Sequence, residues 1–189
     1  GELLGEPRLI KFTTGKRRQA WHKNCVAIGL SSGFLEPLES TSIHMIQTAA
    51  IRLLKLFPHT GIKVAEVAEY NRQTNEEIDH IRDFIILHYP ATERDDSEYW
   101  RHCRTMSIPD SLRHKIELFQ QTGKVSTPTE HLFSDVAWQQ VMIGQGIEPQ
   151  GYHPLADAMS SEQLVEYHRN IKSIISQVVD KLPKHQDFL

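Results

Sequence analysis

The sequence has few cysteines, no block of five like charges and no long apolar run. Its two cysteines, Cys25 and Cys103, match no metal-binding or redox spacing, which predicts reduced thiols in a cytoplasmic protein. The formal net charge of -3, without a basic block, argues against nucleic acid as a partner. No apolar run approaches the roughly 20 residues that span a bilayer, so no membrane partner is expected either.

Metal-binding motifs and a signal peptide are also missing. Eleven histidines occur, but none stands in an HExxH or HxH arrangement, and no metal site is therefore predicted. The first residues, GELLGEPRLIKF, are polar, contain early acids and lack an initiating methionine. They lead at once into a strand pattern, which suggests that the chain is a piece of a longer protein.

What is present is an ordinary globular composition, 39% hydrophobic and 24% charged, in a chain long enough for one domain. Residues 8–12 alternate in polarity and predict a strand, 13–16 a turn and 17–21 the returning strand of a hairpin. Residues 24–30, NCVAIGL, are almost entirely apolar, as in a strand buried on both faces. The chain offers no partners that would complete a parallel sheet around that strand, which again suggests a piece of a larger protein.

The rest of the sequence has helical periodicity. Apolar residues recur at helical spacing over 42–57 and over 62–88, where a break near 71–74 would divide the second pattern into two helices. The predicted class is α+β and mostly helical, with a short hairpin and one buried strand before the helices. Further helices are expected at 95–106, at 109–122, from Ser134 to Met142, and from Ser160 or Ser161 onward.

Polar side chains gather where the apolar run meets the first helix, in LSSGFLEPLESTSIHMIQ at residues 30–47. Glu39 stands directly before three hydroxyl residues at the expected helix start. The first-turn amides of a helix lack intrahelical acceptors, and together with the helix dipole they attract anions. A plain Ser/Thr cap that binds nothing is the alternative. Glu39 would repel an anion bound there unless its carboxylate points elsewhere.

This segment resembles a known family. GLSSGFLEPLESTSI after NCVAIG is similar to the signature of flavin-dependent halogenases of the tryptophan halogenase family. EYNRQTNEEIDHIRDFIILHYPATERDDSEYWR resembles the family's helical segment, and WQQVMIGQGIEP resembles the segment after it. The resemblance covers most of residues 8–150.

The resemblance implies a flavin-monooxygenase-like, FAD/NAD(P)-binding fold with a mostly helical substrate module. Residues 1–58 would form the end of the FAD and halide module, and 59–189 the helical substrate-side module. The GxGxxG fingerprint, the WxWxIP motif and the catalytic lysine of the family have no counterpart in this sequence. The chain therefore resembles the C-terminal portion, with the N-terminal dinucleotide-binding part outside it.

The family's chemistry gives expectations for cofactors and partners. Reduced FAD and oxygen oxidise a bound halide to hypohalous acid, which halogenates an aromatic carbon beside a lysine and a glutamate. The implied cofactors are FAD, reduced by a separate flavin reductase, and chloride or bromide. The implied partners are the N-terminal FAD-binding part of the same protein, the reductase, a small indole-like aromatic substrate and a second copy of the protein in a homodimer.

The resemblance also assigns roles to residues near the helix start. Glu39 matches the active-site glutamate, which faces the substrate and stabilises its cationic intermediate. Thr41 and Ser42 match the positions whose backbone amides hold the halide. This assignment agrees with the anion site expected from the helix terminus.

Further residues are assigned to flavin and substrate. Gly33, Pro37 and Leu38 lie on the loop that approaches the flavin ring in the family. Substrate contacts are expected from Glu39, with Ser40, Phe133 and Trp138 beside it. Phe133 and Trp138 fall near positions of aromatic substrate contacts, with core packing as the alternative. A tyrosine pair found in tryptophan-specific members is missing here, so free tryptophan is not the expected substrate.

Two other interpretations remain open. A related flavin monooxygenase would oxygenate its substrate without oxidising halide, and the masses of its products would not depend on halide. A non-catalytic helical interaction module would use the hydroxyl cluster as a plain cap, and Glu39→Gln would leave its function unchanged.

Overall fold

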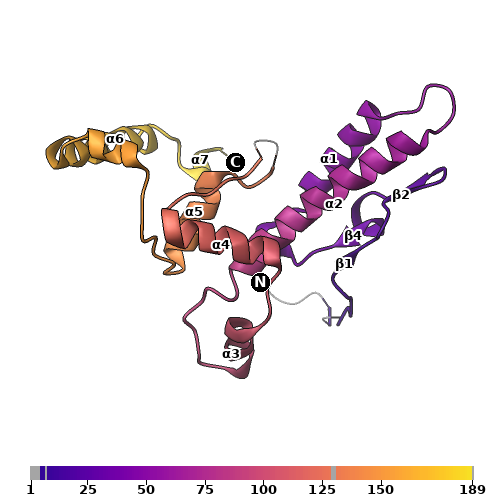
Figure 1. Ribbon diagram of the computed structural model, residues 1–189, viewed down its shortest axis with the longest axis horizontal. Helices are drawn as coiled ribbons and strands as arrows, with labels where there is room; N and C mark the ends of the chain where they lie inside the picture. Colours follow the sequence, from indigo (N-terminus) through magenta and orange to yellow (C-terminus); the bar gives the residue numbers. More distant parts are fainter. Residues whose placement is uncertain (1–4, 7, 129–130, 189) are drawn as a thin grey trace.

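One long helix organises the structure (Figure 1). The computed structural model describes residues 5, 6, 8–128 and 131–188. Helix α2 (Val64–Leu87) lies beside α1 (Ser42–Lys55), and its C-terminal half contacts α4 (Asp110–Thr122) and α5 (Asp135–Gly144). The other elements are β1 (Gly15–Lys16), β2 (Trp21–His22), β3 (Cys25–Val26), β4 (Gly33–Phe34), the 3-10 helices η1 (Gly29–Ser31), η2 (Pro37–Glu39) and η3 (Pro154–Ala158), α3 (Glu98–Thr105), α6 (Ser161–Val179) and α7 (His185–Phe188). The predicted mostly helical class is confirmed.

Two apolar clusters on α2 form the core. One cluster lies at its C-terminal half and the other at its N-terminal half, where Trp21 meets Tyr70 edge to face at 5.5 Å. Burying such side chains stabilises the fold by about 1.5–3 kcal/mol each, so α2 is the main scaffold. The buried members of the first cluster are Phe84, Leu87, Leu112, Phe119, Trp138 and Met142, and those of the second are Ala20, Trp21 and Tyr70.

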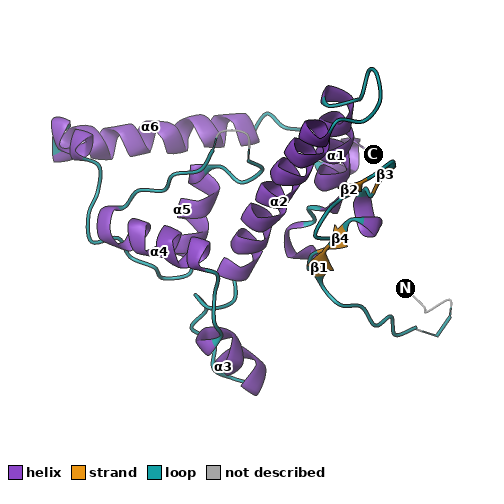
Figure 2. Cartoon of the chain, turned by 45° about the vertical axis from the view of Figure 1, so that its right-hand side comes forward, coloured by secondary structure: helices purple, strands orange, loops and turns teal. Residues whose placement is uncertain are grey.

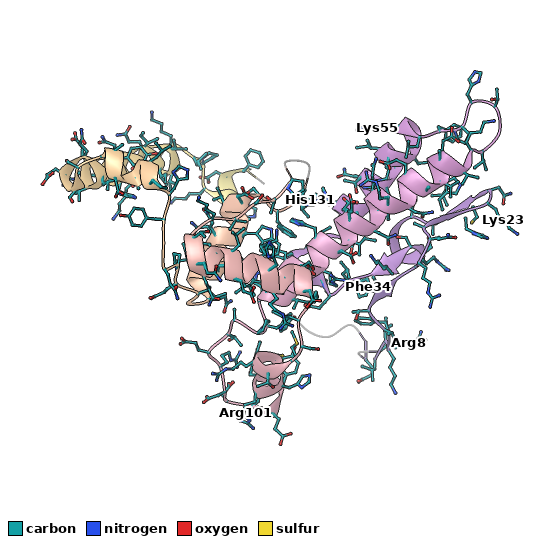
Figure 3. The ribbon with its side chains drawn as sticks, viewed as in Figure 1. Arg8, Lys23, Phe34, Lys55, Arg101 and His131 are labelled. Atoms are coloured by element: carbon teal, nitrogen blue, oxygen red, sulfur yellow. The ribbon has the colours of Figure 1, made fainter. Side chains whose placement is uncertain are left out.

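The hairpin predicted from residues 8–12 and 17–21 is wrong. Residues 8–14 have no regular secondary structure, and β2 instead pairs antiparallel with β3, with Trp21 opposite Val26. The tip of this hairpin is formed at Lys23, which adopts a positive φ of 53° (Figure 3). Alternating polarity in residues 8–12 does not produce a strand because no described strand of this chain pairs with them.

The strand predicted over residues 24–30 is also wrong in length and in burial. Only Cys25 and Val26 are paired, and Cys25 is exposed. Gly29 then takes a positive φ of 66° and starts η1, which ends the extended backbone. A Cβ at Gly29 would lie 3.2 Å from Cγ1 of Ile46, so this turn also brings the loop close to α1.

The predicted break near 71–74 is absent, because α2 runs without interruption from Val64 to Leu87. The polar residues there serve tertiary contacts. Asn71 accepts a hydrogen bond from the Trp21 amide and donates one to the Trp21 carbonyl, both at 2.9 Å. Thr74 accepts a 2.9 Å hydrogen bond from Arg52 of α1. These side chains hold the β2–β3 hairpin and α1 against α2.

The later helices occur where the sequence predicts them, within a few residues. Ser134 caps α5 by accepting from the Ala137 amide, and Ser160 forms a capping box with Gln163 at the start of α6. No residue of α6 (Figure 2) is buried in the described chain, and its apolar side chains Ile171, Ile174, Ile175 and Val178 are exposed. Among the described residues no helix is long and apolar enough to cross a membrane.

Candidate active site

The candidate site begins with the loop between β4 and α1. After β4 the chain enters η2, which starts at Pro37 and ends at Glu39. Ser40 then adopts the left-handed conformation, with φ 52° and ψ 38°. A non-glycine residue held there costs about 1–2 kcal/mol, and such strain concentrates at functional sites. This turn at Ser40 separates Glu39 from the start of α1.

The carboxylate of Glu39 is held by the C-terminal end of α2. Its Oε1 lies 3.2 Å from Nε2 of His88. The other ring nitrogen, Nδ1, lies 2.9 Å from the carbonyl oxygen of Phe84. Because a carbonyl only accepts, Nδ1 carries a proton. The contact with Glu39 therefore requires a further proton, either on Nε2 or on the carboxyl group.

Tyr89, the residue after His88, holds a second glutamate of the same loop, Glu36. The hydroxyl of Tyr89 donates a hydrogen bond to Oε2 of Glu36. Burial, followed by this contact with Glu36, raises the pKa of Tyr89, so its hydroxyl remains a donor. His88 and Tyr89 thus fix the loop at two carboxylates that stand three positions apart.

The start of α1 has no side-chain cap from its N-cap residue. Thr41 occupies the N-cap position, but its side chain makes no cap hydrogen bond, and the first turn contains no acidic residue. Thr41 is 3% exposed, and Ser42 opens onto a cavity of about 50 Å³ between the strands, α1 and α2. Among the described residues no side chain accepts from the first-turn amides, which is the condition for the predicted halide role of Thr41 and Ser42.

Gly33 lines the same cavity as Ser42, but strand pairing already explains it. A Cβ at Gly33 would lie 2.7 Å from the Gly15 carbonyl oxygen and 2.9 Å from Cα of Lys16. The residue must therefore be glycine for β4 to pair with β1, whatever its relation to flavin. Leu38, assigned to the flavin loop with Pro37, exposes 46% of its surface.

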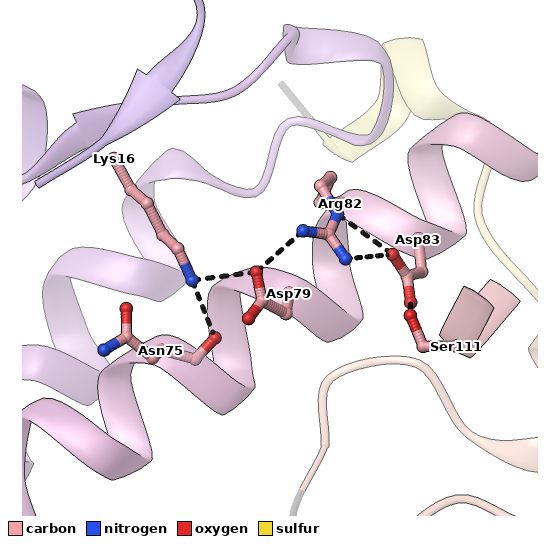
Figure 4. A network of polar contacts seen from close by, with 6 residues as sticks. All are labelled: Lys16, Asn75, Asp79, Arg82, Asp83 and Ser111. Atoms are coloured by element: carbon pink, nitrogen blue, oxygen red, sulfur yellow. Dashed lines mark hydrogen bonds and ion pairs between the residues drawn. The ribbon is translucent and has the colours of Figure 1, made fainter. Parts of the chain in front are cut away.

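An ion-pair network holds β1 in place beside Gly33 (Figure 4). Nζ of Lys16 lies 2.8 Å from Oδ1 of Asp79, which also pairs with Arg82 at 2.9 Å. Arg82 contacts Asp83 at 2.6 Å, and Ser111 of α4 donates to the same carboxylate. The network connects β1, α2 and α4, so the β1–β4 pair has a fixed position on α2.

The two predicted substrate aromatics both contact the ring of Phe84. Phe133 stacks on Phe84 with ring centroids 3.8 Å apart, and Trp138 meets Phe84 edge to face at 5.0 Å. Trp138 is fully buried, and its Nε1 donates to Nε2 of His80 at 3.4 Å. In this chain Trp138 therefore packs as a core residue. Phe133 is only partly buried.

Phe84 connects the aromatic pair to Glu39. Its ring contacts the imidazole of His88 edge to face at 5.2 Å, and its carbonyl accepts from the same imidazole. The order of contact is thus Glu39, His88, Phe84 and Phe133. The sequence did not single out Phe84 or His88. The signal was present in the IRDFIILHY segment, where the two stand four residues apart on one helix face.

His80 is buried beside a second histidine ring. Burial, then His131 and Lys115, lower the pKa of His80 to about 4. A neutral ring accepts the hydrogen bond from Trp138, and the His131 ring lies 4.1 Å away. Within the described ranges no group of three or more His, Cys, Asp or Glu side chains could hold a metal ion.

Sequence comparison identifies related proteins. The tryptophan halogenase family model matches residues 1–161. A 7-chloro-L-tryptophan 6-halogenase from Kutzneria sp. (strain 744) is 34% identical, and the alignment covers 97% of this chain and 36% of the relative. The chain therefore spans about a third of the length of the relatives it matches.

Solved structures show the same relation and establish the family. A flavin-dependent halogenase from Xanthomonas campestris superposes with a TM-score of 0.93 at 51% identity, covering 98% of this chain and 38% of that one. A flavin-dependent halogenase from Brevundimonas sp. BAL3 gives 0.91 at 43% identity, with the same coverage of both chains. The chain belongs to the tryptophan halogenase family.

Proposed function

We propose that this chain supplies the substrate-facing carboxylate and the halide-binding segment of a flavin-dependent halogenase. The whole enzyme would use reduced FAD, oxygen and chloride or bromide to halogenate an electron-rich, indole-like aromatic substrate. One observation carries the proposal: the left-handed turn at Ser40 separates a carboxylate held by His88 from an uncapped helix start at Thr41. A carboxylate and an anion site therefore stand two residues apart with different surroundings.

The residues of this chain would act on the halide and the substrate. When bound, reduced FAD and oxygen supply the two-electron oxidation that turns halide into hypohalous acid. The amides of Thr41 and Ser42 would hold the halide through the partial positive charge of the helix start. As the aromatic carbon gains halogen it becomes cationic before losing its proton, and Glu39 would stabilise that charge. Phe133, beside Phe84, would contact the aromatic ring of the substrate.

This chain would form part of the FAD site. Leu38 and Leu30 expose 46% and 77% of their surfaces, and each side chain could contact a flat apolar ring. With Gly33 and Pro37 they would form the ring-facing loop of the 1–58 module, while residues 59–189 would face the substrate. No GxGxxG fingerprint is present, so the nucleotide half of FAD would be held by the N-terminal FAD-binding part.

Other partners follow from the same proposal. A flavin reductase would deliver reduced FAD, and a second copy of the protein would complete a homodimer. We place the enzyme in the cytoplasm, where the free thiols of Cys25 and Cys103 would stay reduced. The relatives act on tryptophan by name, but the missing tyrosine pair favours an indole without the free amino acid group.

The test uses the complete halogenase polypeptide that contains this chain. It is incubated with FAD, a flavin reductase, NADH, bromide and indole, and the products are analysed by mass spectrometry. The proposal predicts bromoindole with its paired isotope masses, and its loss when bromide is omitted or Glu39→Gln is introduced. An oxygenated product formed without halide would show a flavin monooxygenase instead. Full bromination by Glu39→Gln would refute the role of the carboxylate.

A further inference from the structure

The end of α2 holds the η2 loop by two adjacent residues of different chemistry. Tyr89 uses a neutral hydroxyl to bind Glu36, and His88 uses a ring nitrogen to bind Glu39. Both contacts attach the loop to the helix. Only the contact of His88 touches Glu39, the carboxylate on which the proposed function rests. Changes at Tyr89 therefore test attachment of the loop, and changes at His88 also test the orientation of Glu39.

The imidazole of His88 is itself fixed on two sides. Its Nδ1 donates to the Phe84 carbonyl at 2.9 Å, and the edge contact with the Phe84 ring, 5.2 Å between centroids, sets its plane. The side chain is 19% exposed. A ring held in this way can present Nε2 in only one direction, toward Oε1 of Glu39.

Glu39 has one oxygen engaged and one available. Oε1 contacts His88 at 3.2 Å, and within the described part of the chain Oε2 has no hydrogen bond. The Glu39 side chain keeps 34% of its surface exposed. A free glutamate would sample several rotamers in solvent, whereas this one is anchored through one oxygen with the other left for a ligand.

We propose that His88 is the positioning residue of the active-site glutamate: it binds Oε1 and thereby directs Oε2 toward the substrate. The inference rests on the proposed function of Glu39. Among the described residues the ion-pair partner of the imidazole is Glu39, while Phe84 supplies a carbonyl and an uncharged ring. Phe84 also stacks on Phe133, the predicted substrate aromatic. Through Phe84, His88 is therefore connected to Phe133 as well as to Glu39.

Three substitutions of His88 distinguish its contact with Glu39 from its contacts with the carbonyl and the ring of Phe84. His88→Gln retains an N–H that reaches Glu39. His88→Asn retains a donor only for the Phe84 carbonyl, and His88→Phe retains the ring without a donor. In the complete halogenase we expect His88→Gln to stay within about threefold of wild-type kcat, and the other two to lose about tenfold or more, the size of one coupled contact. The KM for indole should change little, since the anchored oxygen does not bind the substrate.

Tyr89→Phe is the matched control. It removes the adjacent contact to Glu36 and leaves the Glu39 pair intact, so kcat should stay within about twofold. Equal losses in Tyr89→Phe and His88→Phe would show that both residues merely attach the loop and would overturn the inference. Bound FAD and melting temperature, measured for every variant, identify any that fail to fold, and His88→Gln then still tests the claim.

A double-mutant cycle gives the decisive comparison. If His88 acts through Glu39, His88→Phe should cause no further loss of kcat in a Glu39→Gln background. Independent, multiplicative losses would contradict this. A Glu39→Gln enzyme with full activity would instead remove the proposed function, and the two failures are thereby distinguishable.

Discussion

At the scale of single residues, the site depends on two unusual backbone positions. Ser40 is left-handed without being glycine, and Gly33 has no room for a side chain beside β1. The first reverses the chain between Glu39 and α1, and the second fixes the strand that leads into the loop. Neither requirement is visible in the FLEPLEST pattern itself, because backbone angles and cross-strand distances arise only in the folded chain.

Gly33→Ala tests the second requirement. Its Cβ would lie 2.7 Å from a backbone oxygen, and backbone atoms cannot move aside as a flexible side chain can. We expect a loss of about 1–3 kcal/mol in the free energy of unfolding, measured by denaturant titration of the complete polypeptide.

Gly15→Ala is the matched control for that change. Gly15 stands in the partner strand, opposite Phe34, and a Cβ there meets no atom within 4 Å. Its effect should stay within about 0.5 kcal/mol. Equal destabilisation by both substitutions would show that the pairing of β1 with β4 does not limit position 33.

At the scale of elements, α2 explains both the successes and the errors of the sequence interpretation. The helical periodicity of α2 was visible in the sequence, but the polar residues Asn71 and Thr74 suggested a break. Their partners Trp21 and Arg52 lie far away in sequence, so the sequence alone did not show that these side chains make tertiary contacts. Strand placement failed for the same reason. Two-residue strands depend on tertiary contacts, whereas a long amphipathic helix can be predicted from the periodicity of its own residues.

The contact between α2 and α5 predicts a pH dependence of stability. The pKa of His80 is about 4 in the folded chain, below its ordinary 6.5, so the unfolded chain binds more protons between these values. Stability from the neutral ring is complete above about pH 6.5 and is lost as the pH falls toward 4. Burial of the ring, which disfavours its charged form, is the main physical reason, and protonation of Nε2 would also remove the acceptor of the Trp138 hydrogen bond.

His80→Gln keeps an acceptor for Trp138 but does not titrate. Its melting temperature should fall less than that of the wild type between pH 6.5 and about 4. His168→Gln on exposed α6 should follow the wild type, since that imidazole contacts only its own helix. Identical pH profiles for His80→Gln and the wild type would contradict a buried neutral His80.

At the scale of the whole molecule, α2 is the scaffold on which the loop with Glu39 and the later helices are held. Family membership and the helical class were predictable from local motifs. The role of α2's C-terminal end was not, because Glu39 and His88 are 49 positions apart and only folding brings them together. Trp138 illustrates the opposite case: the sequence left both substrate contact and core packing open, and the structure shows it fully buried in the core.

The central claim is that Glu39 does chemistry that its neighbour Glu36 does not. Both glutamates lie on one loop and both are held by the end of α2, so a direct test compares the bromination rates of Glu39→Gln and Glu36→Gln in the complete enzyme. The account predicts a loss of about 100-fold for Glu39→Gln, the scale of one electrostatic stabiliser, and less than about threefold for Glu36→Gln. Equal rates for the two variants would contradict it.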